Sequence, residues 1–181
     1  MYGYLMHYGI KGMKWGVRKD RDSGNSIFIS GSSKTQDKSS GYYRRKLPRG
    51  VRKEIKGYIR NGDRILVGDA PGIDRQVQDF LNKKRYNNVT VYGPGKKVRY
   101  SANAKWKTKP VDAPQYKEMS PEWLREKDIA MTNDSNRGLA IVLDKGGAKA
   151  TRNNIDRLRK QRKDVSVFEI SSSGRRRDRY I

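Results

Sequence analysis

Residues that support several common kinds of chemistry are scarce in this 181-residue chain. It contains no cysteine and one histidine, His7. The absence of cysteine excludes disulfides, cysteine-based zinc sites and thiol nucleophiles. A single histidine leaves no histidine metal cluster, and it makes a Ser-His-Asp triad improbable. We therefore expect no metal site, and we expect a protein that works in a reducing compartment.

Long apolar runs are also missing. No stretch approaches the roughly 20 apolar residues that a membrane helix needs, and the first residues lack the order of a signal peptide. We expect no membrane partner. Hydrophobic residues make up 34% of the chain, below the ~45–50% of an average globular domain, so the core must be small.

Acidic residues are outnumbered by basic ones. There are 42 Lys and Arg against 19 Asp and Glu, which gives a formal net charge of +23. The apolar pattern is confined to the middle of the chain. This predicts a basic N-terminal arm (residues 1–25), one domain (residues 26–170) and a basic C-terminal tail (residues 171–181).

Strand and helix patterns alternate within the domain. Short apolar runs rich in β-branched residues occur at 26–30, 64–67, 89–92, 139–143 and 165–170, as in strands buried on both faces. Helical spacing occurs at 49–60, 71–86, 120–131 and 148–163. The order predicts an α/β domain of three layers with a mostly parallel, five-stranded sheet. Residues 34–48 are expected to form a polar loop, and residues from about 96 to 119 a basic insert.

The ends of the predicted strands carry the most informative residues. Glycines follow four of the five runs, and the carboxyl ends of parallel strands share one edge of a sheet, where ligands bind. Glycine lets backbone N–H groups approach an anion, and each following helix adds partial positive charge. The candidate ligand-binding residues are Gly31, Ser32, Ser33, Lys34, Gly68, Asp69, Gly72, Asp74, Arg75, Gly93, Gly146, Gly147, Thr151 and Asn154.

These residues predict a site for a phosphate-containing nucleotide, in which Asp69 or Asp74 could accept hydrogen bonds from ribose or base groups. The plainer alternative is that each glycine only makes a tight strand-to-helix turn. No G-x-x-x-x-G-K-[ST] motif occurs, and no G-x-G-x-x-G follows the first strand, which argues against a conventional ATPase or NAD-dependent dehydrogenase.

Two of these loops, residues 29–33 (ISGSS) and 67–74 (VGDAPGID), resemble the first two loops of the SLOG superfamily. That superfamily includes Smf/DprA DNA-processing proteins and LOG-type nucleotide hydrolases. Residues 127–131 (KDIAM) are similar to its Arg-Asn-x-x-Met stretch, and residues 146–154 to its Gly-Gly-x-Gly-Thr-x-x-Glu loop. The resemblance implies a Rossmann-like nucleotide-binding domain over about residues 26–170, one that often self-associates into a homo-oligomer.

The resemblance also bears on catalysis. LOG-type hydrolases use a glutamate where Asn154 or a neighbour stands here, and an amide cannot act as a general base or stabilise an oxocarbenium ion. We therefore expect binding without turnover. No catalytic residue and no cofactor is assigned.

The first residues carry a second resemblance. Residues 7–18 (HYGIKGMKWGVR) resemble a peptide that recurs in tailed-phage, head-associated proteins. This implies a phage protein in the cytoplasm of an infected bacterium, with a virion component as a further partner. The function expected from both resemblances is a phage-encoded binder of a nucleotide or nucleotide-derived small molecule, which could sequester a host immune-signalling nucleotide.

Other functions stay open at this point. Basic clusters at residues 44–56, 96–109 and 175–179 suit nucleic acid, and Tyr100 and Trp106 could stack on bases, as in a DNA- or RNA-binding protein of the Smf/DprA kind. A nucleotide N-glycoside hydrolase of the LOG kind could use Asp69, Asp74 or Asp144. A purely structural phage-head protein is the remaining alternative.

Overall fold

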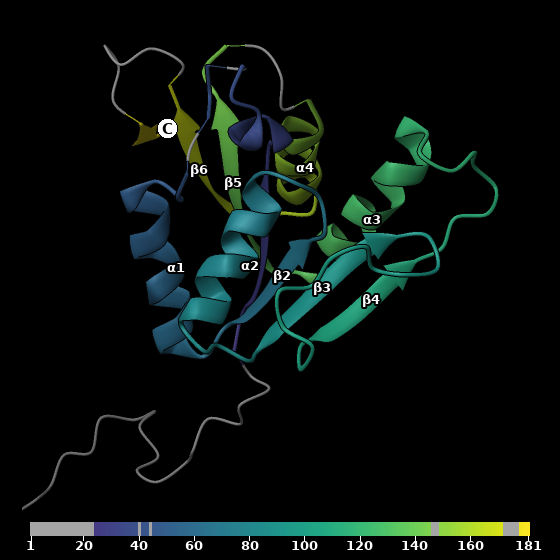
Figure 1. Cartoon of the computed structure of the whole chain (residues 1–181), viewed down its shortest axis with the longest axis horizontal. Coiled ribbons are helices and arrows are strands. Elements are labelled where there is room, and N and C mark those ends of the chain that lie inside the picture. The colour runs from purple at the N-terminus through teal and green to yellow at the C-terminus, as the bar shows by residue number, and fades with distance from the viewer. Residues whose placement is uncertain (1–23, 40, 44, 146–148, 172–177) are drawn as a thin grey trace, which may run out of the picture.

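The computed structural model describes residues 24–39, 41–43, 45–145, 149–171 and 178–181. Within them one seven-stranded sheet runs in the order β4-β3-β2-β1-β5-β6-β7 (Figure 1). Strands β1 to β6 are mutually parallel, and β7 is antiparallel to β6. The strands are β1 (Ser26–Gly31), β2 (Arg64–Gly68), β3 (Val89–Pro94), β4 (Lys107–Val111), β5 (Arg137–Leu143), β6 (Asp164–Ile170) and β7 (Arg179–Tyr180).

Helices cover both faces of the sheet. They are α1 (Arg49–Asn61), α2 (Ile73–Lys83), α3 (Pro121–Asp134) and α4 (Lys149–Lys160), and a short 3-10 helix, η1 (Ser33–Gln36), follows β1. The α/β fold with a mostly parallel sheet in three layers is therefore confirmed. None of the helices in the described residues is long and apolar enough to cross a bilayer.

The alternation of side chains along the strands builds a core on each face. Ile27 and Ile29 of β1 belong to the cluster that packs against α1 and α2, whereas Phe28 between them packs with Met131 of α3 and Leu158 of α4. All five side chains are buried. This is why the strands appear as continuous apolar runs: each face of the sheet requires apolar side chains.

The number of strands differs from the five expected. The additional strands, β4 and β7, lie in the predicted basic insert and the predicted basic tail. Four of the five residues of β4 and both residues of β7 are classed as exposed, so neither strand carries the apolar run that marks a buried strand. An edge strand has a neighbouring strand on one side only. Charged or polar side chains on such a strand discourage pairing of its free side with another chain.

The basic insert is packed against the domain. Trp106 is buried, and its indole N–H donates to the Tyr86 carbonyl at 2.8 Å. Tyr100 donates to Asp79 at 3.1 Å and lies beneath the Arg75 guanidinium. Trp106 is therefore not available to stack on bases, contrary to the role considered from the sequence.

Helix boundaries follow local chemistry. Ser120 caps α3 by accepting from the Trp123 N–H at 3.2 Å, as the Ser-Pro-Glu pattern predicts. Helix α2 begins at Ile73, two residues later than expected, because Gly72 has φ 85° and ψ −126° and cannot be helical. The predicted arm lies outside the described residues except for Gly24 and Asn25, and so do residues 172–177 of the predicted tail.

Candidate functional site

The strand order defines a switch point beside β1. From β1 the chain proceeds through β2 and β3 to β4 on one side, and it then crosses to β5 on the other side of β1. In open parallel sheets, ligands bind outside the carboxyl ends of the strands at such a point. A cleft of about 370 Å³ lies there, lined by the end of β1, η1, the start of α2, and residues of α3 and α4.

Half of the residues predicted from the sequence line this cleft. They are Gly31, Ser32, Ser33, Lys34, Asp74, Thr151 and Asn154. They come from three loops that are up to about 120 positions apart in the chain, and the fold brings them together. The expectation that separate strand ends meet at one edge is thus met for the loops after β1, β2 and β5.

Five other predicted residues lie outside the lining. Gly68, Gly72 and Gly93 are buried, Asp69 is buried behind Arg99, and Arg75 is exposed above Tyr100. The remaining two, Gly146 and Gly147, lie outside the described residues. A binding role for these two glycines stays a prediction.

Packing accounts for the buried glycines. A Cβ on Gly68 would lie 2.3 Å from Asp74 Oδ2 and 2.7 Å from Lys127 Nζ. A Cβ on Gly93 would lie 2.7 Å from Asp69 Oδ2. These glycines make room for charged side chains of the protein itself, so packing within the protein accounts for glycine at both positions.

Asp69 positions a cation at the cleft. Its side chain is fully buried, and it accepts from the Arg99 backbone N–H at 2.8 Å, from Nε at 3.0 Å and from Nη2 at 2.5 Å. The Arg99 side chain stays 38% exposed and lines the cleft. Asp69 therefore holds the basic insert and its arginine in place, and it contacts the cleft only through Arg99.

A buried carboxylate and a buried ammonium lie at the base of the cleft. Asp74 and Lys127 are 6% and 8% exposed, and both reach the space above Gly68. Burial raises the pKa of Asp74 to about 6, although the nearby Lys127 ammonium opposes this rise. Burial lowers the pKa of Lys127, but Asp128 and Asp74 outweigh that effect and its pKa is raised.

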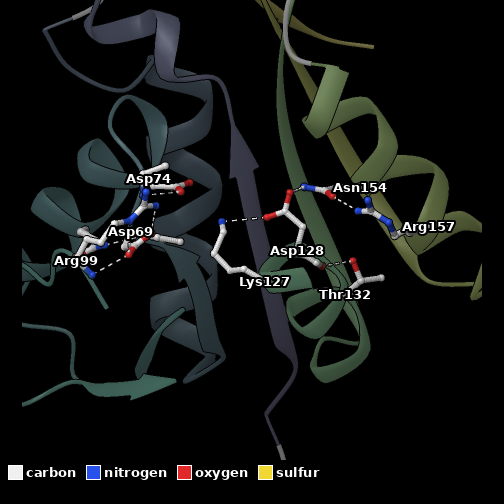
Figure 2. Close-up of polar contacts among 11 residues, drawn as sticks. Asp69, Asp74, Arg99, Lys127, Asp128, Thr132, Asn154 and Arg157 are labelled. Carbon is white, nitrogen blue, oxygen red and sulfur yellow. Dashed lines mark hydrogen bonds and ion pairs between the residues drawn. The ribbon is translucent and has the colours of Figure 1, made fainter. Parts of the chain in front are cut away.

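A chain of polar contacts continues across the cleft (Figure 2). Lys127 Nζ lies 3.0 Å from Asp128 Oδ1, and the Asn154 amide donates to Asp128 Oδ2 at 3.2 Å. Arg157 in turn donates to the Asn154 carbonyl oxygen. Asp69, Asp74 and Arg99 lie on one side of β1 in this view, and Asp128, Asn154 and Arg157 lie on the other.

The lining combines positive charge with apolar surface. Four cations, Lys34, Arg99, Lys127 and Lys149, accompany two carboxylates, Asp74 and Asp128. The partly exposed Leu124 adds apolar surface, whereas Phe28 is almost fully buried in the core. The first turn of α4 adds partial positive charge. Such a lining can bind an anionic group and pack against a flat ring. Among the described residues, no three side chains of metal-ligating type converge.

Three charged residues of the lining were not among those expected from the sequence to act at this edge: Arg99, Lys127 and Asp128. Arg99 stands within a basic run, and nothing local marks it as the partner of Asp69, 30 positions away. Lys127 and Asp128 carried a signal, because residues 127–131 resemble the Arg-Asn-x-x-Met stretch. Lys149, two residues before Thr151 at the start of α4, is expected from the sequence to add positive charge at this edge, and it lines the cleft.

Comparison with known protein families gives a match at the start of the chain. A family of unknown function (DUF7211) matches residues 2–22. This match contains the peptide of residues 7–18 and ends before β1, so it does not bear on the cleft. No curated protein matches the chain.

The conformation of Gly72 generates the first prediction. Gly72→Ala should lower the free energy of unfolding by more than about 2 kcal/mol, because φ is positive and the new Cβ would lie 2.4 Å from Ser32 O and Ser33 Cα. Gly57→Ala is the matched control: Gly57 lies in α1 with open space around its Cβ position, so this change should be neutral or stabilise by about 0.5–1 kcal/mol. Urea unfolding measures both, and equal effects would contradict the account.

The raised pKa of Asp74 generates a pH prediction. The folded pKa of about 6 exceeds the unfolded value of about 3.9, so the folded state holds the extra proton between these values. The stability of the protein relative to Asp74→Asn should therefore fall by about 2–3 kcal/mol as the pH rises from about 4 to about 7.

Urea unfolding of both proteins at several pH values tests this. Asp156→Asn, which alters an exposed carboxylate of α4, controls for the loss of one negative charge. A difference between the protein and Asp74→Asn that stays constant with pH would show that Asp74 titrates in the ordinary range.

Proposed function

We propose that the cleft at the end of β1 binds a nucleotide or a nucleotide-derived small molecule. The observation that carries this proposal is the convergence of four cations at the switch point of a parallel sheet. The cations would bind phosphate, and the partly exposed Leu124 would pack against a base. The sequence resemblance of the loops to the SLOG superfamily supports the same ligand class.

Binding without turnover fits the way the carboxylates are engaged. Both oxygens of Asp128 already accept contacts, from Lys127 and Asn154, and Asp74 is buried at the base. A carboxylate held in this way orients ligand donors more readily than it activates a water. Together with the phage-like peptide at residues 7–18, this supports sequestration of a host immune-signalling nucleotide as the biological role.

Two measurements test the proposal. Mass spectrometry of small molecules released by heating the purified protein should detect a nucleotide-type compound. Calorimetric titration with cyclic nucleotides, nucleoside monophosphates and ADP-ribose should give saturable heat with at least one of them. No released compound and no heat from any member of the panel would overturn the proposal.

A pair of charge variants locates the site. Lys149→Gln should weaken binding of the compound that gives heat about tenfold, because it removes one charged hydrogen bond worth about 1.5 kcal/mol. Lys160→Gln removes the same charge from the last turn of the same helix, away from the cleft lining, and should change the affinity less than about twofold. Equal losses in the two variants would indicate general electrostatic attraction instead of a site.

One observation favours a second candidate, nucleotide N-glycoside hydrolysis. The carboxylate that the sequence lacks at Asn154 is present beside it in space, because Asp128 lines the cleft and contacts Asn154. A carboxylate there could stabilise an oxocarbenium-like transition state. Of the carboxylates considered from the sequence, Asp69 is engaged by Arg99, and Asp144 contacts Tyr42 and Ser171 outside the cleft lining.

Chromatography of nucleoside monophosphates incubated with the protein distinguishes the two candidates. Hydrolysis predicts release of the free base, which Asp128→Asn should abolish and Asp156→Asn should preserve. Absence of free base from every nucleotide would contradict the hydrolase and would leave the binding proposal intact.

A further inference from the structure

A second pocket lies between α1 and α2, on the sheet face that these helices cover. Its volume is about 320 Å³, and it shares no lining residue with the cleft. Six cations line it, from the loop before α1 and from both helices: Arg45, Lys46, Arg52, Lys56, Lys83 and Lys84. Leu47 and Phe80 provide apolar surface.

The positive charge of this pocket is not balanced within the protein. None of the six cations has an ion pair within the part of the chain that the structure describes. The single carboxylate of the lining, Asp79, already accepts a hydrogen bond from Tyr100 at 3.1 Å. Arg52 Nε is buried and has no hydrogen-bond partner among the residues that the structure describes. A buried donor without an acceptor costs about 1–3 kcal/mol, which an incoming anion would relieve.

The positive charge extends from the pocket along α1. Its basic residues are Arg49, Arg52, Lys53, Lys56 and Arg60. This spacing places them on one stripe of the helix, opposite the buried Val51, Ile55 and Tyr58. The one acidic residue of the helix, Glu54, accepts a hydrogen bond from Tyr58. A solvent-facing helix surface that only needed solubility would mix both signs, because like charges three or four residues apart repel each other.

We propose that this α1–α2 surface, comprising the pocket and the basic stripe, binds the phosphate backbone of double-stranded nucleic acid. The pocket would hold a phosphate, and the stripe, about 20 Å long for 13 residues, would follow the neighbouring phosphates. The only aromatic residue of the pocket lining is the half-buried Phe80. The surface therefore offers no platform for stacking unpaired bases, and the higher charge density of a duplex favours it over a single strand.

Fluorescence anisotropy with a labelled DNA duplex of mixed sequence, and with one of its strands alone, tests the proposal on the full chain. Log affinity for the duplex should fall linearly with log salt between about 50 and 200 mM. The variant Lys56→Gln/Lys83→Gln/Lys84→Gln should bind the duplex at least about tenfold more weakly at the lowest salt. It should also reduce the salt slope by about 2–3, close to one phosphate contact for each lysine.

The matched control removes the same charge elsewhere. Lys105→Gln/Lys107→Gln/Lys117→Gln changes three exposed lysines of the insert and should alter the affinity less than about threefold. Circular dichroism checks that both variants are folded, and Lys149→Gln should leave duplex binding unchanged, which keeps this test separate from that of the cleft.

Four results would overturn the proposal. These are equal losses in the two triple variants, no loss in the pocket variant, single strand bound tenfold more tightly than duplex, and competition by polyglutamate as effective as that by duplex. The last result would assign the surface to an acidic protein partner.

Discussion

The close contact between the end of β1 and the turn after β2 fixes the positions of the loops that line the cleft. Ile73 occupies the space that a Cβ on Gly31 would need, and its N–H donates to the Ser32 carbonyl at 3.2 Å. Gly72 lies against the backbone of Ser32 and Ser33. Because Asp74 follows immediately, this contact sets its position beneath the cleft. It also holds η1, which includes Lys34, at the edge of the cleft.

Charged side chains are buried at this end of the domain, whereas the two cores along the strands are built mostly from apolar side chains. Asp74, Lys127 and Asp128 bridge from α2 to α3 across β1 and β2. Burying such groups costs several kcal/mol for each ion, and their mutual attraction often does no more than offset that cost. A buried charge cluster that contributes little net stability, lying at a switch point, is therefore best explained by what it presents to the cleft.

The sequence allowed much of the fold to be predicted, because strands buried on both faces are continuous apolar runs and their turns are rich in glycine. It did not reveal β4, whose lysines and proline resemble a loop. Within the site, the loops after β1, β2 and β5 were identified by their glycines. Arg99 was not, because its role arises from a tertiary contact with Asp69 that no local pattern encodes. Lys127 and Asp128 were visible only as an imperfect resemblance.

The two outer strands have a consequence for self-association. Pro110 deprives β4 of a backbone donor, the flanking Lys107 and Lys109 are exposed, and β7 offers only two residues at the opposite border. Long apolar strands such as β5 lie inside the sheet, between these two edges. They are therefore shielded from pairing with strands of another molecule, and such pairing is a common route to amyloid-like aggregation. Within the described residues, neither border of the sheet therefore offers a long apolar strand along which a second copy could extend the sheet.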